Sequence, residues 1–335
     1  MAKPYTIYGS EMSPYSHKVR SWFRYKQIDH LWIPGGPGSQ DPEYRRLARL
    51  PIVPLVVYPD GGTALQDSTP IIEKLEAEFP EPGIGPPGTL LSFLSTLMEE
   101  FGDEWGNKLM FHLRWYADVD MSASSLRAAR LTLPKGTENE VKERAEVVRE
   151  RMSGRGHFVG SSDRTAPLIA TYYVELLDVL QQHLEKRKYL FGARPAFADF
   201  ALAAQLYHAS ADPTGGSIMR ARALNVLDWC FRMMEPRNDG PFEEWVELEG
   251  TMKPLLDYIG RLFLPWTNAN AIALTAGVDE FTVVLDGKAY VQPPQRYHAK
   301  SLGVLRQKYS EVADDSPLRD LLFEANCLEF LQPKS

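Results

Sequence analysis

The sequence has very few cysteines: Cys230 and Cys327 are the only two in 335 residues. A chain of this length does not depend on a disulfide framework, which suits a reducing compartment. It has no apolar run of about 18 residues that could span a bilayer, and no apolar signal region at its start. Its net charge of -7 does not provide the basic surface that nucleic acids and acidic membranes attract. We therefore expect a soluble, cytoplasmic protein with no nucleic-acid or membrane partner.

Metal-site spacing and several catalytic motifs are also missing. The seven histidines are not spaced as ligands with one another or with Cys, Asp or Glu, so we expect no metal. No Gly-x-Ser-x-Gly nucleophile elbow occurs. A thiol reductase needs a protein thiolate at a helix start, and Ser13 and Ser16 stand where that cysteine would be. The sequence thus disfavours a glutaredoxin-like reductase.

The residues that are present predict a small α/β domain followed by a larger all-helical one. Hydrophobic residues make up 44% of the chain, enough for a substantial core. The first 80 residues have the pattern strand, helix, strand, strand, strand, helix, with a Gly/Pro-rich loop at 34–42. A Pro/Gly-rich linker follows at 80–88. The predicted elements are strands at 5–9, 29–34, 52–58 and 63–66, helices at 14–27, from 67 or 68, 90–116, 138–153, 166–184, 197–211, 225–234 and 299–309, and a β-hairpin at 281–291.

Three domain ranges follow from this pattern. Residues 1–82 form the α/β domain, 89–265 the helical domain, and 266–335 an extension with a β-hairpin and a helix. The hairpin is indicated by β-branched residues around the turn dipeptide Asp286-Gly287.

The first candidate site residue is Ser13, between the first strand and the first helix. A helix N-terminus favours a negative charge, and a thiolate there is stabilised. Because no cysteine lies nearby, the thiol would come from a ligand. The alternative is that Ser13 only caps its helix.

Two further candidates lie at strand ends. A cis peptide at Val53-Pro54 would present backbone groups to an extended peptide, although the local sequence alone favours an ordinary trans proline. In Gln66-Asp67-Ser68, the hydroxyl and amide could hold a carboxylate at a helix start, and Asp67 could accept from an ammonium. Plain helix capping is again the alternative.

Taken together, these segments resemble the N-terminal domain of the glutathione transferase family, which has a thioredoxin-like fold. The stretch 13–20, Ser-Pro-Tyr-Ser-His-Lys-Val-Arg, is similar to the active-site segment of serine-type members, especially the plant tau class. Val53-Pro54 matches the family's Val-Pro step with its cis-proline, and Asp67-Ser68 matches its acid-Ser pair. Residues 194–200, ending in Ala198-Asp199-Phe200, resemble a helix start in the family's second domain. The chain is identified as a serine-type, bacterial-like member with a long C-terminal extension.

The resemblance implies that glutathione is the co-substrate. Its cysteinyl backbone would pair with Val53 beside Pro54, and its γ-glutamyl end would lie at Gln66, Asp67 and Ser68. Ser13 would donate a hydrogen bond to the sulfur and so favour the thiolate, with Tyr15 and Ser16 as alternates. The thiolate would attack an electrophilic, apolar substrate by conjugation or a related cleavage or isomerisation.

The electrophile pocket is expected on the helical domain. Its candidate residues are Tyr15, Trp105, Lys108, His112 and Trp115, although core packing is the alternative for each aromatic side chain.

The chain departs from the family pattern in three places. Ala196 replaces the capping Ser/Thr before Ala198-Asp199. Ile52 replaces the lysine before the Val-Pro step, whose contact to the glycyl carboxylate could come from Arg45, Arg46 or Arg49 instead. The chain is also about half as long again as a typical member. These departures keep open a non-catalytic binding or interaction protein. A homodimer is expected from the family, unless the extension covers the pairing surface.

Overall fold

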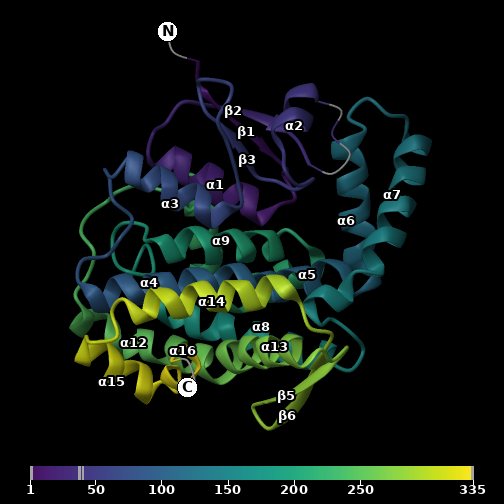
Figure 1. Cartoon of the computed structure of the whole chain (residues 1–335). Coiled ribbons are helices and arrows are strands. Elements are labelled where there is room, and N and C mark those ends of the chain that lie inside the picture. Colours follow the sequence, from purple (N-terminus) through teal and green to yellow (C-terminus); the bar gives the residue numbers. More distant parts are fainter. Residues whose placement is uncertain (1–2, 37–38, 40, 333–335) are drawn as a thin grey trace.

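The computed structural model describes residues 3–36, 39 and 41–332. The α/β domain lies on one side of the helical domain, with α1 and α3 between its sheet and α9 (Figure 1). Its elements are β1 (Tyr5–Gly9), α1 (Pro14–Tyr25), β2 (His30–Pro34), α2 (Pro42–Leu47), β3 (Leu55–Val57), β4 (Ala64–Gln66) and α3 (Ser68–Glu78). The predicted order of strands and helices is confirmed, with α2 as an addition.

The four strands form one mixed sheet in the order β2-β1-β3-β4. Strand β1 runs parallel to β2 and antiparallel to β3, with Tyr8 opposite Leu55. Strand β4 runs antiparallel to β3, with Gln66 opposite Leu55. The end of β1, the start of β3 and the end of β4 therefore lie at one edge of the sheet.

Helix α2 lies just after the region expected to be a loop. It is only six residues long, which is too short to show a helical period. The Asp41 side chain caps it by accepting from the N–H groups of Glu43 and Tyr44, and Pro42 opens its first turn. Residues 37, 38 and 40 of the expected loop lie outside the described residues.

The helical domain is confirmed, with more helices than the pattern predicted. Its elements are α4 (Thr89–Phe101), the π-helix η1 (Gly102–Gly106), α5 (Asn107–Trp115), α6 (Asp118–Thr132), α7 (Glu138–Ser153), the 3-10 helix η2 (Gly156–Val159), α8 (Ala166–His183), α9 (Phe197–Ser210), α10 (Pro213–Arg222), α11 (Leu224–Arg232), α12 (Trp245–Tyr258), the π-helix η3 (Ile259–Phe263) and α13 (Leu264–Ala276). Segments α4, η1 and α5 follow one another without a break, where one helix was expected. Helices α6 and α7 form a pair that stands beside the α/β domain (Figure 1).

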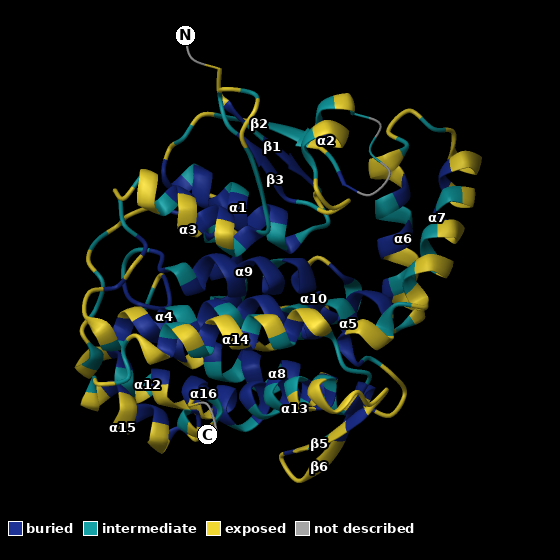
Figure 2. Ribbon diagram, in the orientation of Figure 1, coloured by how far each residue is buried: buried dark blue, intermediate teal, exposed yellow. Residues whose placement is uncertain are grey.

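The C-terminal extension contains the predicted hairpin and helix and two short helices besides. Its elements are β5 (Phe281–Leu285), β6 (Lys288–Gln292), α14 (Arg296–Ser310), α15 (Ser316–Glu324) and α16 (Leu328–Leu331). The expected boundary at residue 265 lies inside α13, which continues from α12 through η3. Trp105 of the helical domain and Tyr290 and Tyr309 of the extension share one hydrophobic core with Trp22 of the α/β domain. Figure 2 shows this buried interior across the whole molecule.

None of the helices in the described part of the chain is long and apolar enough to cross a membrane. Within residues 3–36, 39 and 41–332, no group of three or more His, Cys, Asp or Glu side chains could hold a metal ion.

Candidate active site

Ser13 lies where the sequence predicted it, at the N-cap of α1. Its backbone is extended, and its Oγ accepts from the N–H of Ser16 at 3.2 Å. A serine hydroxyl has one proton to donate in addition to its two acceptor positions. Among the described residues, none accepts that proton from Ser13. The capping role therefore leaves the hydroxyl free to donate to a ligand atom above the helix start.

The two alternates to Ser13 point elsewhere. The Tyr15 hydroxyl donates to the backbone carbonyl of Asp103 at 2.9 Å. Burial, with Glu104 and Asp103 nearby, raises the pKa of Tyr15 well above its usual value. The Ser16 hydroxyl is buried and accepts from the N–H of Ser10 at 3.2 Å. Both side chains hold the β1–α1 step in place.

The Val53-Pro54 peptide bond is cis, as the family resemblance implied and contrary to the local sequence preference. Continuing the β1–β3 register from Tyr8 opposite Leu55 brings Val53 level with Ser10. The N–H and carbonyl of Val53 have no partner among the described residues. They are available to pair with an extended peptide.

Gln66 is a support for this edge of the sheet. Its side-chain amide accepts from the N–H groups of Arg49 (2.8 Å) and Leu50 (3.1 Å). It donates to the carbonyls of Leu50 (2.9 Å) and Ile52 (3.1 Å). The amide has four hydrogen-bonding positions and all of them are used within the chain. Gln66 therefore fixes the loop that leads into Val53.

Asp67 and Ser68 begin α3 next to Pro54. Asp67 has a φ of +77° and its carboxylate makes no capping hydrogen bond, so the capping alternative does not apply to it. Such a backbone costs about 1–3 kcal/mol and is found mainly at functional sites. Burial raises the pKa of Asp67, and Lys18, Tyr297 and Lys300 oppose that rise. In the described structure, the N–H groups of Ser68 and Thr69 have no partner, so the helix start can receive a carboxylate.

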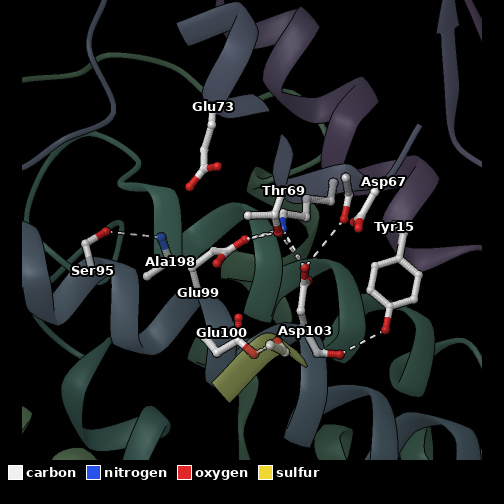
Figure 3. Close-up of polar contacts among 12 residues, drawn as sticks. Tyr15, Asp67, Thr69, Glu73, Ser95, Glu99, Glu100, Asp103 and Ala198 are labelled. Carbon is white, nitrogen blue, oxygen red and sulfur yellow. Dashed lines mark hydrogen bonds and ion pairs between the residues drawn. The ribbon is translucent and has the colours of Figure 1, made fainter. Parts of the chain in front are cut away.

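A buried charged cluster that includes Thr69, Glu99 and Asp103 lies beside the start of α3 (Figure 3). The Lys18 ammonium contacts Glu99 at 2.5 Å, Asp103 at 2.6 Å and the Thr69 hydroxyl at 2.9 Å. Burial alone would lower the pKa of Lys18, but the two carboxylates outweigh it and raise the pKa. Burial raises the pKa of Asp103 to about 7, against the opposing effect of Lys18.

Ser68 connects this cluster to the edge of the sheet. Its buried Oγ lies 3.4 Å from Asp103 Oδ2, whereas Oδ1 of Asp103 is buried without a partner. Glu99 and Asp103 were not among the predicted site residues. A signal existed: four acids at 99, 100, 103 and 104 lie on a largely apolar helix with no basic neighbour in the same stretch.

A cleft of about 760 Å³ opens beside the β1–α1 step. One wall contains Gly9, Ser10 and Glu11, and the other contains residues 131–133 of the α6 end together with Arg144 of α7. Trp32, Pro34, Gly35, Gly36, Ser39 and Asp41 complete it. The cleft is thus walled by the α6–α7 pair instead of by α5.

The four α5-region residues expected in the pocket lie in the core. The indole N–H of Trp105 donates to the Tyr258 hydroxyl at 3.0 Å, and Trp115 is buried. His112 bonds the Ser161 hydroxyl at 2.8 Å, and burial, followed by Lys108, lowers its pKa to about 4.

Lys108 is buried between η2, α13 and the β5–β6 hairpin of the extension. Its ammonium lies 4.1 Å from the centre of the Trp266 ring and donates to Gln292 at 2.9 Å. Burial lowers the pKa of Lys108 well below its usual value.

The positions where the sequence differs from the family pattern make other hydrogen bonds within the chain. Asp199 supports the start of α9 by accepting from the N–H of Ala196 at 2.8 Å, and its other oxygen accepts from Trp229 Nε1 and the N–H of Leu190. Arg45 and Arg46 donate to the carbonyls of Ser39 and Gly61.

Comparisons with known proteins identify two domains in the chain. A model of the glutathione S-transferase N-terminal domain matches residues 7–83, and one of the C-terminal domain matches residues 146–230. Neither match extends into the C-terminal extension. A comparison with curated protein sequences finds no match.

Three solved structures with a similar chain are glutathione S-transferases or like them. The enzyme from Rhodospirillum rubrum F11 is 18% identical, covers 75% of this chain and 91% of its own, and has a TM-score of 0.44. The GST-like protein from Pseudomonas syringae is 16% identical, with coverages of 70% and 67% and a TM-score of 0.46. The enzyme from Methylobacillus flagellatus KT is 20% identical, with coverages of 69% and 95% and a TM-score of 0.40. With both of the family's domains in their usual order, the chain belongs to the glutathione S-transferase family.

Proposed function

We propose that this protein is a glutathione transferase that activates the glutathione thiol for attack on an electrophile. One observation carries the proposal: the candidate residues meet at one edge of the sheet. Ser13 comes after the end of β1, Val53 comes before the start of β3, and Asp67-Ser68 follows the end of β4. Neighbouring strands lie about 4.8 Å apart, so the ends of β1 and β4 are separated by about 10 Å. An extended tripeptide spans about 10 Å. The edge has the length that glutathione requires.

Each group at this edge suits one part of the ligand. The ammonium of the γ-glutamyl end would face Asp67, and its carboxylate the N-terminus of α3. The cysteinyl N–H and carbonyl would pair with Val53. This leaves the sulfur above the start of α1, within reach of the Ser13 hydroxyl.

The chemistry then depends on the charge of the sulfur. A hydrogen bond from Ser13 stabilises the thiolate over the thiol and lowers the pKa of the bound thiol. The thiolate uses a lone pair to form a bond to an electrophilic carbon, and the displaced pair leaves with a leaving group or moves onto a neighbouring atom that is then protonated. The electrophile would lie in the cleft against Leu131 and Leu133, which favours an apolar substrate.

A non-catalytic binding protein is the second candidate, and one observation favours it. Asp67 and Ser68 already have partners within the chain, Tyr297 and Asp103. Glutathione would have to share or replace these contacts. A non-catalytic binding or interaction protein that kept the fold fits this arrangement.

The test combines calorimetry with a rate assay. Glutathione binding at pH 7 is measured on wild type and Ser68→Ala, and conjugation of 1-chloro-2,4-dinitrobenzene on wild type, Ser13→Ala, Ser13→Gly and Ser13→Thr. Ser13→Thr retains both the cap and a hydroxyl and should behave like wild type. Ser13→Gly should cost the helix only about a few tenths of a kcal/mol but has no hydroxyl, so it separates chemistry from helix capping. A hydrogen bond to a charged atom contributes about 1.5–3 kcal/mol, so Ser13→Ala should lower kcat by about 10- to 100-fold at pH 7.

The outcomes distinguish the two candidates. Binding together with loss of turnover in Ser13→Ala supports the enzyme. Binding by wild type with no turnover supports the binding protein. No binding by wild type contradicts the enzyme and supports an interaction protein that has kept the fold without the glutathione site.

We further propose a cytoplasmic location and a homodimer. Helix α14 covers the α4 side of the chain, so a dimer would use faces that the extension leaves open. Light scattering after size-exclusion chromatography measures this directly: twice the mass of 37.9 kDa is expected.

A further inference from the structure

Helix α14 of the C-terminal extension reaches the start of α3. The Tyr297 hydroxyl donates to the Asp67 carboxylate, 3.4 Å from Oδ1 and 3.3 Å from Oδ2. The two residues are 230 positions apart, and Tyr297 stays 53% exposed. A residue outside both matched domains thus contacts the acid expected to receive the γ-glutamyl ammonium.

Several side chains fix α14 in this position. His298 bonds Glu104, Ser301 bonds Glu100 and Lys308 contacts Glu73 at 2.5 Å. Glu100 lies on α4 and Glu73 lies on α3. Contacts from the first turn to the last hold the helix along α4, so Tyr297 lies on a fixed element.

The exposed Lys300 brings a positive charge to the same place. It lies one turn after Tyr297 and acts electrostatically on Asp67. In the described part of the chain, it forms no ion pair with an acidic side chain. The γ-glutamyl end of glutathione carries an ammonium and a carboxylate side by side, so a site for it needs an acid and a positive group together.

We propose that α14 forms the outer wall of the γ-glutamyl subsite, with Tyr297 as a positioning residue for Asp67 and Lys300 as the partner of the ligand's α-carboxylate. The inference rests on the proposed function and deepens it. It assigns a role to the extension, which completes the subsite within one chain. The ligand class it selects is a γ-glutamyl peptide with a free amino group.

The experiment compares two ligands on the full-length protein. Calorimetry at pH 7 measures glutathione and its deamino analogue, glutaryl-cysteinyl-glycine, which lacks the ammonium. Tyr297→Phe should weaken glutathione binding by about three- to tenfold and leave the analogue unchanged, because the phenol acts through Asp67. Lys300→Gln should weaken both ligands, and its effect should shrink at high salt. Tyr309→Phe, which removes a buried hydroxyl near the other end of α14, is the matched control and should bind both ligands like wild type.

Equal loss of both ligands in Tyr297→Phe would overturn the positioning role. A second possible result is that Tyr297→Phe and Lys300→Gln both bind glutathione like wild type while Ser68→Ala binds it more weakly. That result would refute the α14 wall and leave the proposed glutathione site intact. No glutathione binding by wild type would refute the proposed function and the wall together.

Discussion

Lys18 and Asp103 form a buried ion pair of 2.6 Å that joins α1 of the α/β domain to the helical domain. The Lys18 side chain is fully enclosed, and Glu99 lies on its other side at 2.5 Å. One cation therefore serves two carboxylates in the interface between the domains.

Lys18→Met should destabilise the protein severely. It leaves Glu99 and Asp103 buried without a positive partner, and breaking a buried pair in this way costs about 3–5 kcal/mol. Urea unfolding at pH 7 measures the free energy of unfolding. Lys74→Met is the control: Lys74 forms an exposed pair with Glu78 at 3.2 Å, so its loss should change stability by about 0.5 kcal/mol or less. Equal costs for the two variants would mean that the cluster does not hold the domains together.

The same cluster predicts a pH dependence of stability. Burial raises the pKa of Asp103 to about 7, and the second carboxylate adds to this because Lys18 can neutralise only one. An unfolded aspartate has a pKa of about 3.9, so the folded state holds an extra proton between about pH 4 and pH 7. This contribution to stability is complete below about pH 4 and is lost as the pH rises to about 7.

Asp103→Asn isolates that contribution, because an amide does not titrate. Wild type should lose more stability between pH 5 and pH 8 than Asp103→Asn does, as measured by urea midpoints at both values. Parallel pH dependences in the two proteins would exclude Asp103 as the titrating group.

The local sequence correctly predicted where the candidate residues lie relative to the strands and helices at this edge of the sheet. Ser13 and Val53-Pro54 lie at element boundaries that a helix cap and a proline mark, and Asp67-Ser68 lies where β4 ends and α3 begins. The role of Gln66 was not predictable in the same way, because its partners are backbone groups that lie 14 to 17 positions earlier in the chain. Nor was Tyr297, which meets Asp67 only through the path of the extension.

The helical domain shows a different reason for missing elements. Helix α6 has small and polar residues on several sides, and α10 contains Gly215 and Gly216, so neither has a clear apolar stripe. The α5 prediction relied on polar residues among aromatics, which could contact a substrate where that helix face is open. Here the extension covers that face: Lys108 meets Tyr290 and Gln292, almost 200 positions later.

Two substitutions test whether the electrophile binds against α5 or in the cleft beside α6. Lys108→Met removes hydrogen bonds to Val159, Tyr290 and Gln292, so stability should fall by about 1–3 kcal/mol with no change in KM for the electrophile. Leu131→Ser removes an apolar group from the half-exposed cleft wall, so KM should rise several-fold with little change in stability. Urea unfolding and steady-state kinetics measure both. A raised KM in Lys108→Met at unchanged stability would mean that the electrophile binds against α5, as the sequence predicted.

Arg144 predicts which electrophiles the cleft prefers. It faces the cleft from α7, and among the described residues it has no ion-pair partner. The cleft acids are already engaged: Glu11 contacts His17 at 3.1 Å, and Asp41 accepts from the Tyr8 hydroxyl at 3.1 Å. An anionic group on the second substrate would thus meet an unpaired positive charge.

The matched pair 4-chloro-3-nitrobenzoate and 4-chloro-3-nitrobenzamide tests this, since the two differ in charge and hardly in shape. Arg144→Gln should raise KM for the benzoate by about three- to tenfold and leave KM for the amide unchanged, because a charge-assisted hydrogen bond is lost only with the former. Each variant is compared with wild type on the same compound, so the different reactivities of the compounds cancel. Arg151→Gln removes the same charge from an exposed position of α7 away from the cleft and should leave both KM values unchanged. If Arg144→Gln raised KM equally for both compounds, the arginine would affect the shape of the cleft and would not distinguish a charged substrate from a neutral one. If added salt abolished the preference in wild type as well, the contact would be a screened surface attraction and not a pairing within the cleft.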